Sequence, residues 1–297
     1  MGDTNDRTAT APERIEIASP AGVTIVADHW AGPRSPVVLA HGGGQTRHSW
    51  GGTARTLAER GHRVVSIDLR GHGDSTWAAD RDYSMAAYRD DAVAVVEWVG
   101  APVVWVGASL GGMTGLHAVD AAPHRFAALV LVDITPRPAK QGTERILEFM
   151  ADRAVEGFGS LEEAADAIAA YQPHRPRPKD LSGLAKNLRL GEDARWRWHW
   201  DPAFLDVRTG GTGGSSEHAR DRHHDELEAV ARRLTLPTLL VRGKLSDLVT
   251  EDEVVAFREM VPHAEDVDVA GAAHMIAGDR NDVFTAAVLD FIERHDP

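Results

Sequence analysis

The sequence predicts an α/β fold in which a mostly parallel, twisted sheet carries helices on both faces and an inserted helical lid. Two observations support this: short apolar runs that suit buried strands alternate with helical patterns, and the alternation stops at residues 136–233 and then resumes. The chain has 297 residues, 43% of them hydrophobic, which is enough for a substantial core. We therefore expect a core formed by residues 14–135 and 234–297, with the lid at 136–233.

The first part of the expected core consists of apolar strands separated by helical segments. Two short alternating stretches around Pro20 and Gly22 indicate a hairpin over residues 14–30. Glycines at the ends of helical patterns, such as Gly61 and Gly100, predict where helices stop. Strands are expected at 36–40, 62–71, 102–107 and 126–134, and helices at 53–60, 85–99 and from 110 onward.

The pattern changes after the expected strand at 126–134. Residues 136–233 contain helical stretches such as SLEEAADAIAAY, a PHRPRP break and the glycine-rich RTGGTGGSSEH, but no run that suits the sheet. The sheet pattern resumes with expected strands at 236–243 and 264–271, separated by a helix that begins with a capping box formed by Thr250 and Glu253. A last amphipathic helix is expected at 281–295.

Composition excludes several classes of protein. The 45 acidic and 32 basic residues give a net charge of −13, which argues against a nucleic acid partner. No apolar run approaches the roughly 20 residues that span a bilayer, so no membrane partner is expected. The chain has no cysteine, and the adjacent side chains from His223 to Glu226 point in different directions on any regular element, so no metal is expected. The polar residues 1–13 lack the apolar part of a secretion signal and predict a flexible tail on a cytoplasmic protein.

The stretch VVWVGASLGG ends an apolar strand at Ser109, with Gly107 and Gly111 two residues away on either side. This is the pattern of a sharp turn from strand to helix that lifts a serine hydroxyl above the edge of a sheet. The glycines allow backbone and helix to approach without a Cβ clash. A serine needs a base that is itself oriented by a carboxylate, so the pattern predicts Ser109 as the nucleophile of such a set.

Candidates for the partners of this serine follow other expected strands. His274 comes after the last strand, Asp247 comes after the strand before it, and Asp133 at the end of LVLVDI is an alternative acid. The HGGG stretch after the strand at 36–40 offers bare backbone, and we expect the amides of Gly43 and Leu110 to bind the negative charge that develops on a carbonyl oxygen. The carboxyl ends of parallel strands lie at one edge of a sheet, which brings these groups together.

Three tryptophans in RWRWHW lie on one face if that segment is extended. They either attach the lid to the core or line an apolar pocket over Ser109, and the two roles are compatible. The two methionines beside the nucleophile and the base could face the same pocket, although core packing is their usual role. The expected pocket residues are Gly44, Trp196, Trp198, Trp200, Met113 and Met275.

These motifs resemble the α/β-hydrolase superfamily over nearly the whole chain after residue 14. HGGGQTRHSW, GASLGG and LVDI are similar to the branch with cofactor-free peroxidase-like proteins, enol-lactonases and epoxide-hydrolase-like proteins, and DLRGHGDS matches a turn of lidded members. The resemblance implies the fold, a triad of Ser109, Asp247 and His274, and no cofactor. It favours Asp247 over Asp133 because of the usual placement of the acid on this fold. The epoxide hydrolases and haloalkane dehalogenases of the superfamily carry aspartate where this chain has Ser109, so those reactions are not expected.

We therefore expect a lidded serine hydrolase that cleaves a small hydrophobic carboxylic ester or lactone through an acyl-enzyme. The same triad supports hydrolysis of a carbon–carbon bond in a β-diketone-like compound, and the resemblance also implies a perhydrolase activity. A ligand-binding member of the family without turnover is a further alternative. A homodimer is compatible with the sequence.

Overall fold

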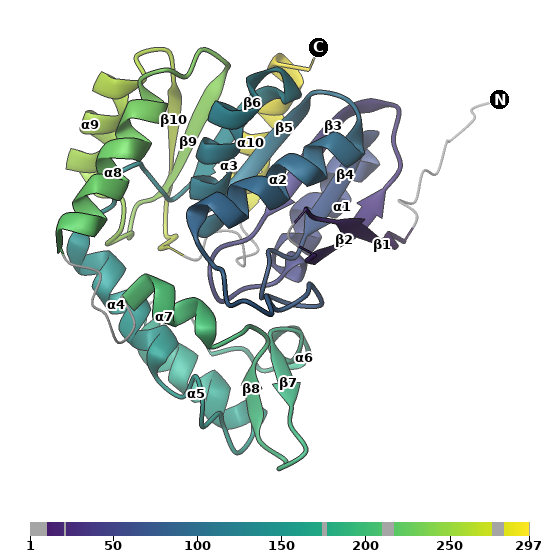
Figure 1. The fold of residues 1–297 in the computed structure, drawn as a ribbon, viewed down its shortest axis with the longest axis vertical. Coiled ribbons are helices and arrows are strands. Elements are labelled where there is room, and N and C mark those ends of the chain that lie inside the picture. Colours follow the sequence, from purple (N-terminus) through teal and green to yellow (C-terminus); the bar gives the residue numbers. More distant parts are fainter. Residues whose placement is uncertain (1–10, 21, 174–176, 210–216, 275–281, 297) are drawn as a thin grey trace.

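The computed structural model describes residues 11–20, 22–173, 177–209, 217–274 and 282–296. An eight-stranded sheet with the order β1-β2-β4-β3-β5-β6-β9-β10 forms its centre (Figure 1). Its strands are β1 (Glu13–Ala18), β2 (Thr24–Trp30), β3 (Arg34–Ala40), β4 (His62–Ile67), β5 (Val103–Ala108), β6 (Phe126–Val132), β9 (Thr238–Gly243) and β10 (Glu265–Val269). The pairs β1–β2 and β2–β4 are antiparallel, and every pair from β4 to β10 is parallel. This confirms the predicted mostly parallel sheet.

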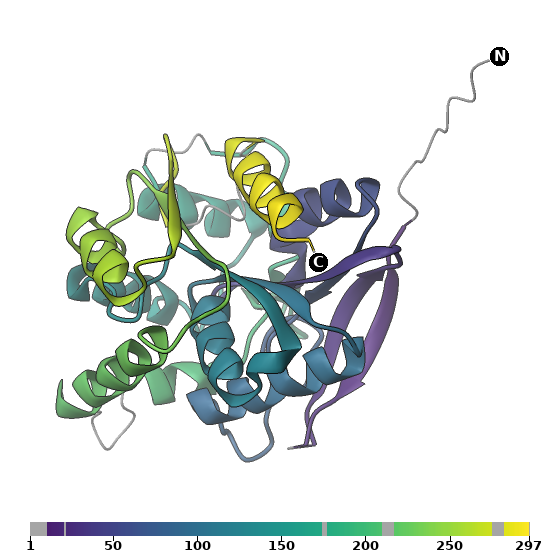
Figure 2. The same cartoon turned by 90° about the horizontal axis from the view of Figure 1, so that it is seen from above.

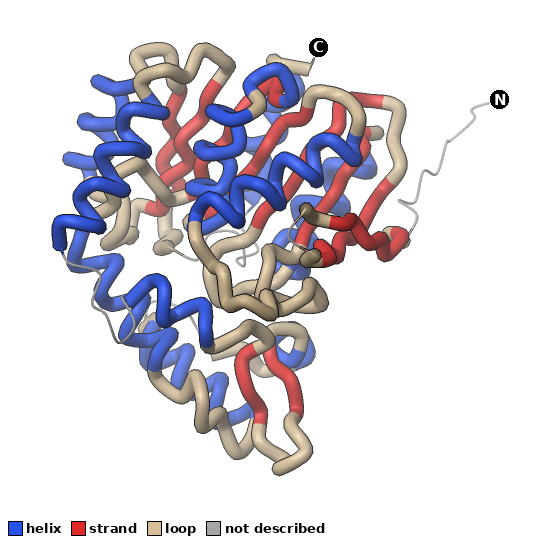
Figure 3. The backbone as a smooth tube through the Cα atoms, in the orientation of Figure 1, coloured by secondary structure: helices blue, strands red, loops and turns tan. Residues whose placement is uncertain are grey.

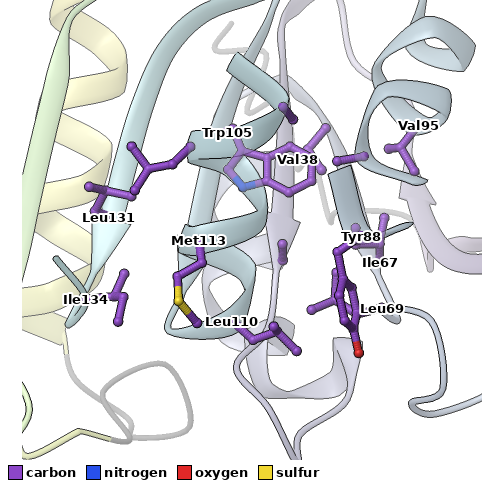
Figure 4. Packing of buried hydrophobic residues seen from close by; sticks show 14 of the residues in the cluster. Val38, Ile67, Leu69, Tyr88, Val95, Trp105, Leu110, Met113, Leu131 and Ile134 are labelled. Atoms are coloured by element: carbon purple, nitrogen blue, oxygen red, sulfur yellow. The ribbon is translucent and has the colours of Figure 1, made fainter. Parts of the chain in front are cut away.

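Helices cover both faces of the sheet (Figure 2). Side chains along each strand alternate between the two faces, so that Trp105 of β5 joins one buried cluster while Val104 and Val106 join the other. The first cluster includes residues of α2 (Met85–Val99), α3 (Leu110–Ala121), α8 (Glu217–Ala231) and α9 (Glu251–Met260), and part of it is shown in Figure 4. The second includes residues of α1 (Gly51–Glu59) and α10 (Asp282–Arg294). Burial of both faces explains why the parallel strands are continuous apolar runs.

Local signals in the sequence set several element ends. Gly100 ends α2 in the left-handed conformation, with φ 77°. Thr250 and Glu253 form the predicted capping box at the start of α9. The predicted hairpin is the antiparallel pair of β1 and β2. No helix in the described part of the chain is long and apolar enough to cross a membrane.

The segment after β6 extends beyond the carboxyl ends of the parallel strands (Figure 3). It contains α4 (Lys140–Ala151), α5 (Leu161–Tyr171), α6 (Ser182–Ala185) and α7 (Ala203–Thr209). Between α6 and α7, the strands β7 (Leu188–Leu190) and β8 (Trp196–Trp198) pair in a small antiparallel sheet. The sequence did not predict these two strands, because three residues are too few to produce a clear alternating pattern.

Helix α8 lies in the range expected for the lid but packs on the core (Figure 1). Leu227, Val230 and Ala231 are three and four residues apart, so they share one helical face, and they are buried in the cluster that also contains residues of α3. We therefore propose a lid that is shorter than expected and consists of residues 136–209.

Candidate active site

Ser109 occupies the turn between β5 and α3 in a strained conformation. Its backbone has φ 45° and ψ −110°, which residues other than glycine rarely adopt. A Cβ at Gly107 would collide with the carbonyl oxygen of Gly111, and a Cβ at Gly111 would collide with that of Ala40. The two glycines are therefore required by close approach of the backbone, as the sequence pattern predicts.

The glycine loop after β3 runs beside this serine. A Cβ added to Gly42 would lie 3.4 Å from the Cβ of Ser109, so the two backbones are close enough for loop amides to reach a group bound at the hydroxyl. Gly43 and Gly44 line the same cavity as Ser109.

Most amides around the serine already donate hydrogen bonds. The acceptors are Gln45 Oε1 for Gly42 (3.1 Å), His72 Nε2 for Gly44 (3.1 Å), the His41 carbonyl for Gly111 (3.1 Å) and the Ser109 carbonyl for Met113 (3.0 Å). Among the described residues, the amides of Gly43 and Leu110 have no such acceptor. These are the two donors that the sequence predicts for an oxyanion, and they remain a proposal.

His274 forms a hydrogen bond with the carboxylate of Asp133. The distance from His274 Nδ1 to Asp133 Oδ2 is 2.9 Å, and Asp133 is fully buried just beyond the end of β6. Because the carboxylate accepts a hydrogen bond from Nδ1–H, the lone pair of the neutral ring is on Nε2. His274 and Ser109 line the same cavity. A histidine held in this tautomer can take a proton from a serine hydroxyl.

Two more donors hold the Asp133 carboxylate. The amide of Gly243 donates to Oδ1 at 3.0 Å, and the hydroxyl of Ser246 donates to Oδ2 at 2.6 Å. Ser246 Oγ also accepts hydrogen bonds from the amides of Leu248 and Val249, which fixes the turn after β9. These bonds compensate for burial of the carboxylate.

The structure corrects the expectation that Asp247 orients the histidine. Asp247 forms an ion pair with Arg145 of α4 instead, with 2.7 Å between Arg145 Nη1 and Asp247 Oδ2, and its side chain is 36% exposed. In the turn after β9, the side chain that reaches the buried carboxylate of Asp133 is Ser246, and its neighbour Asp247 contacts the lid. The alternative acid of the sequence analysis, Asp133, is thus the one beside His274.

A cavity of about 1450 Å³ opens over Ser109, between the glycine loop and the lid. Its described lining includes most of the predicted pocket, together with lid residues that sequence reasoning did not single out. The predicted pocket residues in the lining are Gly44, Met113, Trp198 and Trp200, and the additional lid residues include Phe149, Met150 and Phe204. The lining is largely apolar, which suits a hydrophobic substrate.

Two predicted pocket residues are not among the described residues that line the cavity. Among the described residues Trp196 lies outside the cavity lining, and its backbone pairs with that of Phe158 at 2.7 and 2.8 Å, which ties two parts of the lid together. Met275 lies outside the described residues.

Two buried histidines brace the glycine loop. His41 Nδ1 lies 2.7 Å from the carbonyl oxygen of Gly42, and its Nε2 accepts a hydrogen bond from the amide of Leu69 at 3.0 Å. Burial lowers the pKa of His41 to about 4 and that of His72 to about 3, so both rings are neutral near pH 7. With its nitrogens engaged in the loops, His41 has the bracing role that its place before the glycines indicates. The role of His72 was missed by sequence reasoning.

Comparison with known proteins identifies the family of this chain and several relatives. The family model described as "alpha/beta hydrolase fold" matches residues 35–280. An esterase of Mycobacterium tuberculosis is 29% identical over 86% of this chain and 82% of its own length. A pimeloyl-[acyl-carrier protein] methyl ester esterase of Methylococcus capsulatus is 38% identical over 72% of this chain and 77% of its own.

Solved structures show the same fold. A crystal structure of the M. tuberculosis esterase superposes with a TM-score of 0.73 and 27% identity, covering 96% of this chain and 93% of that one. E-2-(acetamidomethylene)succinate hydrolase superposes with a TM-score of 0.79 at 21% identity, covering 95% of this chain and all of that one, and this likeness concerns the fold alone.

Proposed function

This chain belongs to the alpha/beta hydrolase fold family and is related to esterases, and we propose that it is a serine hydrolase that cleaves a hydrophobic carboxylic ester through an acyl-enzyme. The observation that carries the proposal is the common cavity of Ser109, His274 and the amides of Gly43 and Leu110, in which Asp133 holds the histidine ring. These are the nucleophile, the base, the oxyanion donors and the orienting acid of ester hydrolysis.

In the proposed reaction, Ser109 Oγ attacks the ester carbonyl carbon while His274 Nε2 takes the hydroxyl proton. The carbonyl oxygen becomes negative and accepts hydrogen bonds from the amides of Gly43 and Leu110. When the carbon–oxygen bond to the alcohol breaks, His274 returns the proton to the leaving oxygen. Water then attacks the acyl group by the same steps in reverse, which releases the acid and restores Ser109. Asp133 stabilises the imidazolium of His274 during both acylation and deacylation.

The cavity supports a hydrophobic substrate. It is lined by apolar side chains of the core, such as Met113 and Ile134, and of the lid, such as Trp198 and Phe204. A lactone is the cyclic form of the same bond, and its alcohol would remain attached to the acyl-enzyme. A volume of about 1450 Å³ leaves room for larger acyl or alcohol groups than the sequence alone suggested.

The proposal predicts that a fluorophosphonate labels Ser109. The purified protein is treated with the reagent, and the adduct is located by mass spectrometry. Turnover of p-nitrophenyl esters and lactones is measured in parallel with the wild type and with Ser109→Ala, which should lose several orders of magnitude in kcat because the nucleophile is absent. A Ser109→Ala variant with wild-type turnover would refute the assignment.

Product analysis separates the alternatives that share the serine. Release of an acid and an alcohol supports the ester hydrolase, cleavage of a β-diketone identifies carbon–carbon bond hydrolysis, and peracid formed with hydrogen peroxide identifies a perhydrolase. A protein that small esters stabilise against heat without any turnover or labelling would instead be a binding protein.

A further inference from the structure

The loop after β4 contacts the glycine loop through a fully buried imidazole, that of His72. His72 Nδ1 lies 3.0 Å from the carbonyl oxygen of Arg70, and its Nε2 lies 3.1 Å from the amide nitrogen of Gly44. A carbonyl oxygen only accepts a hydrogen bond and an amide only donates one, so the proton of the neutral ring is on Nδ1 and the lone pair is on Nε2. The ring therefore serves as an acceptor for the Gly44 amide.

The two peptide bonds that flank Gly43 are each held by a histidine. His41 donates to the carbonyl oxygen of Gly42, in the peptide that carries the Gly43 amide, and His72 accepts from the amide of Gly44, in the next peptide. Gly44 has φ 79°, a conformation that favours glycine. Without an acceptor on its amide, the peptide after Gly43 would lose the bond that fixes its plane, and Gly43 would be held from one side only.

The lid docks on the same loop that carries His72 (Figure 3). The amide of Gly73 donates to the carbonyl of His199 at 2.7 Å, and the amide of Asp201 donates to the carbonyl of Gly71 at 2.8 Å. The ring of Phe204 packs edge-on against the ring of His72, with 5.1 Å between centroids. A Cβ added to Gly43 would lie 3.4 Å from Phe204. Lid, imidazole and glycine loop are thus in direct contact.

We propose that His72 is a positioning residue for the oxyanion hole: its Nε2 holds the peptide between Gly43 and Gly44, and its loop links that peptide to the docked lid. This inference rests on the proposed function, because an oxyanion forms only if Ser109 attacks a carbonyl. His72 should therefore stabilise the transition state, in which the Gly43 amide binds negative charge, more than it strengthens substrate binding.

Substitution of His72 by asparagine or by glutamine tests the two hydrogen bonds of the ring one at a time. In His72→Asn the amide nitrogen lies near the position of Nδ1, which keeps a donor for Arg70 and removes the acceptor for Gly44. In His72→Gln the amide oxygen reaches the position of Nε2 and restores an acceptor. His62→Asn is the matched control, because His62 is also fully buried, its Nδ1 lies 3.2 Å from the carbonyl of Ser35, and it lies outside the described lining of the cavity.

The experiment measures kcat and KM for p-nitrophenyl butyrate and the inhibition constant of phenylboronic acid, whose adduct with a serine is tetrahedral and anionic. All values refer to folded protein, determined by circular dichroism. His72→Asn should lower kcat by about 10- to 100-fold with KM within about threefold, and should weaken boronic acid binding by a similar factor. His72→Gln should recover most of kcat, and His62→Asn should retain the wild-type value.

Equal losses of kcat in His72→Asn and His72→Gln, a loss that lies in KM alone, or wild-type kcat in His72→Asn would overturn the inference while leaving the ester hydrolase intact. If the wild type neither hydrolyses esters nor reacts with a fluorophosphonate, the proposed function itself fails and the inference falls with it. Loss of thermal stability without any change in kcat per folded protein identifies a purely structural role and contradicts the proposal.

Discussion

The carboxylate of Asp133 is held from three directions, by His274, Gly243 and Ser246. A buried carboxylate is costly unless donors replace the water it loses, and here each donor also fixes its orientation. In the proposed reaction, the orienting acid is thus in place before any substrate binds. Ser109 is held at a positive φ, and the amides of Gly43 and Leu110 are unpaired in the described structure, so the proposed site is arranged in advance of the reaction.

Asp133→Asn should lower kcat by about 10⁴-fold, because the amide stabilises neither the required tautomer nor the imidazolium. Asp247→Asn should change kcat by less than about threefold, because the half-exposed pair with Arg145 contributes little. Steady-state kinetics with one p-nitrophenyl ester tests both. The reverse ranking of the two variants would restore Asp247 as the triad acid.

Sequence reasoning predicted Ser109 and His274, which the structure places at one cavity, but it preferred Asp247, whereas the carboxylate bonded to His274 is that of Asp133. The glycines around Ser109 reflect contacts within a few residues, and these leave a local pattern. Asp133 and Asp247 both follow strands that end at the same edge of the sheet, so strand order alone does not separate them. Which aspartate bonds to the histidine depends on which side chain of the turn after β9 points toward the buried Asp133. In this structure that side chain is Ser246.

At the scale of elements, the lid helices α4 and α7 each place a side chain against the glycine loop. Met150 of α4 and Phe204 of α7 approach closely, since a Cβ on Gly44 would lie 3.1 Å from Met150 Cε and one on Gly43 would lie 3.4 Å from Phe204. Both side chains line the cavity. The space next to the amides of the glycine loop is therefore set by the lid, and the size of the group that fits there depends on these side chains.

Met150→Ala should shift specificity toward bulkier or branched acyl groups. Removing the side chain opens space beside the glycine loop, so the ratio of kcat/KM for p-nitrophenyl pivalate to that for the acetate should rise by about 10-fold, within the range that pocket size controls. Val155→Ala is the control, because Val155 lies just after α4 and is 72% exposed. An unchanged ratio in Met150→Ala, or an equal shift in both variants, would show that Met150 does not shape the acyl site.

Whether the sequence predicts a helix or strand depends on the length of that element and on the part of the fold against which it packs. Strands such as β5 and β6 are buried on both faces, so their apolar runs are continuous and were predicted. The strands β7 and β8 have three residues each and gain their pairing from tertiary context. Sequence reasoning assigned α8 to the lid, because the spacing of Leu227 and Val230 does not reveal whether they cover the sheet or the lid.

At the scale of the whole molecule, the sheet acts as the scaffold that gathers the site. β3 leads to the glycine loop, β5 to Ser109, β6 to Asp133, and the turn after β10 to His274. These strands are parallel, so their carboxyl ends meet at one edge (Figure 1). The lid covers that edge, and two buried neutral histidines, His41 and His72, connect the loops beneath it. Stability and the geometry of the site are therefore linked through these two rings.

This link predicts a specific sensitivity to acid. Burial lowers the pKa of His41 to about 4 and that of His72 to about 3, whereas an unfolded chain has histidine pKa values near 6.5. Below pH 6.5 the unfolded state thus binds protons that the folded state does not, so each ring removes up to about 1.4 kcal/mol of stability per pH unit as the pH falls toward the folded value. Urea unfolding followed by circular dichroism between pH 7 and pH 4 measures this slope.

The variant His72→Gln isolates the contribution of one ring, because it removes one of the two titrating groups while the carboxylates stay the same. As the pH falls, its free energy of unfolding should decrease less steeply than that of the wild type, by up to about 1.4 kcal/mol per pH unit. Parallel curves for the two proteins would mean that the folded state binds a proton on the His72 ring as readily as the unfolded state does, which its acceptor role toward Gly44 does not allow.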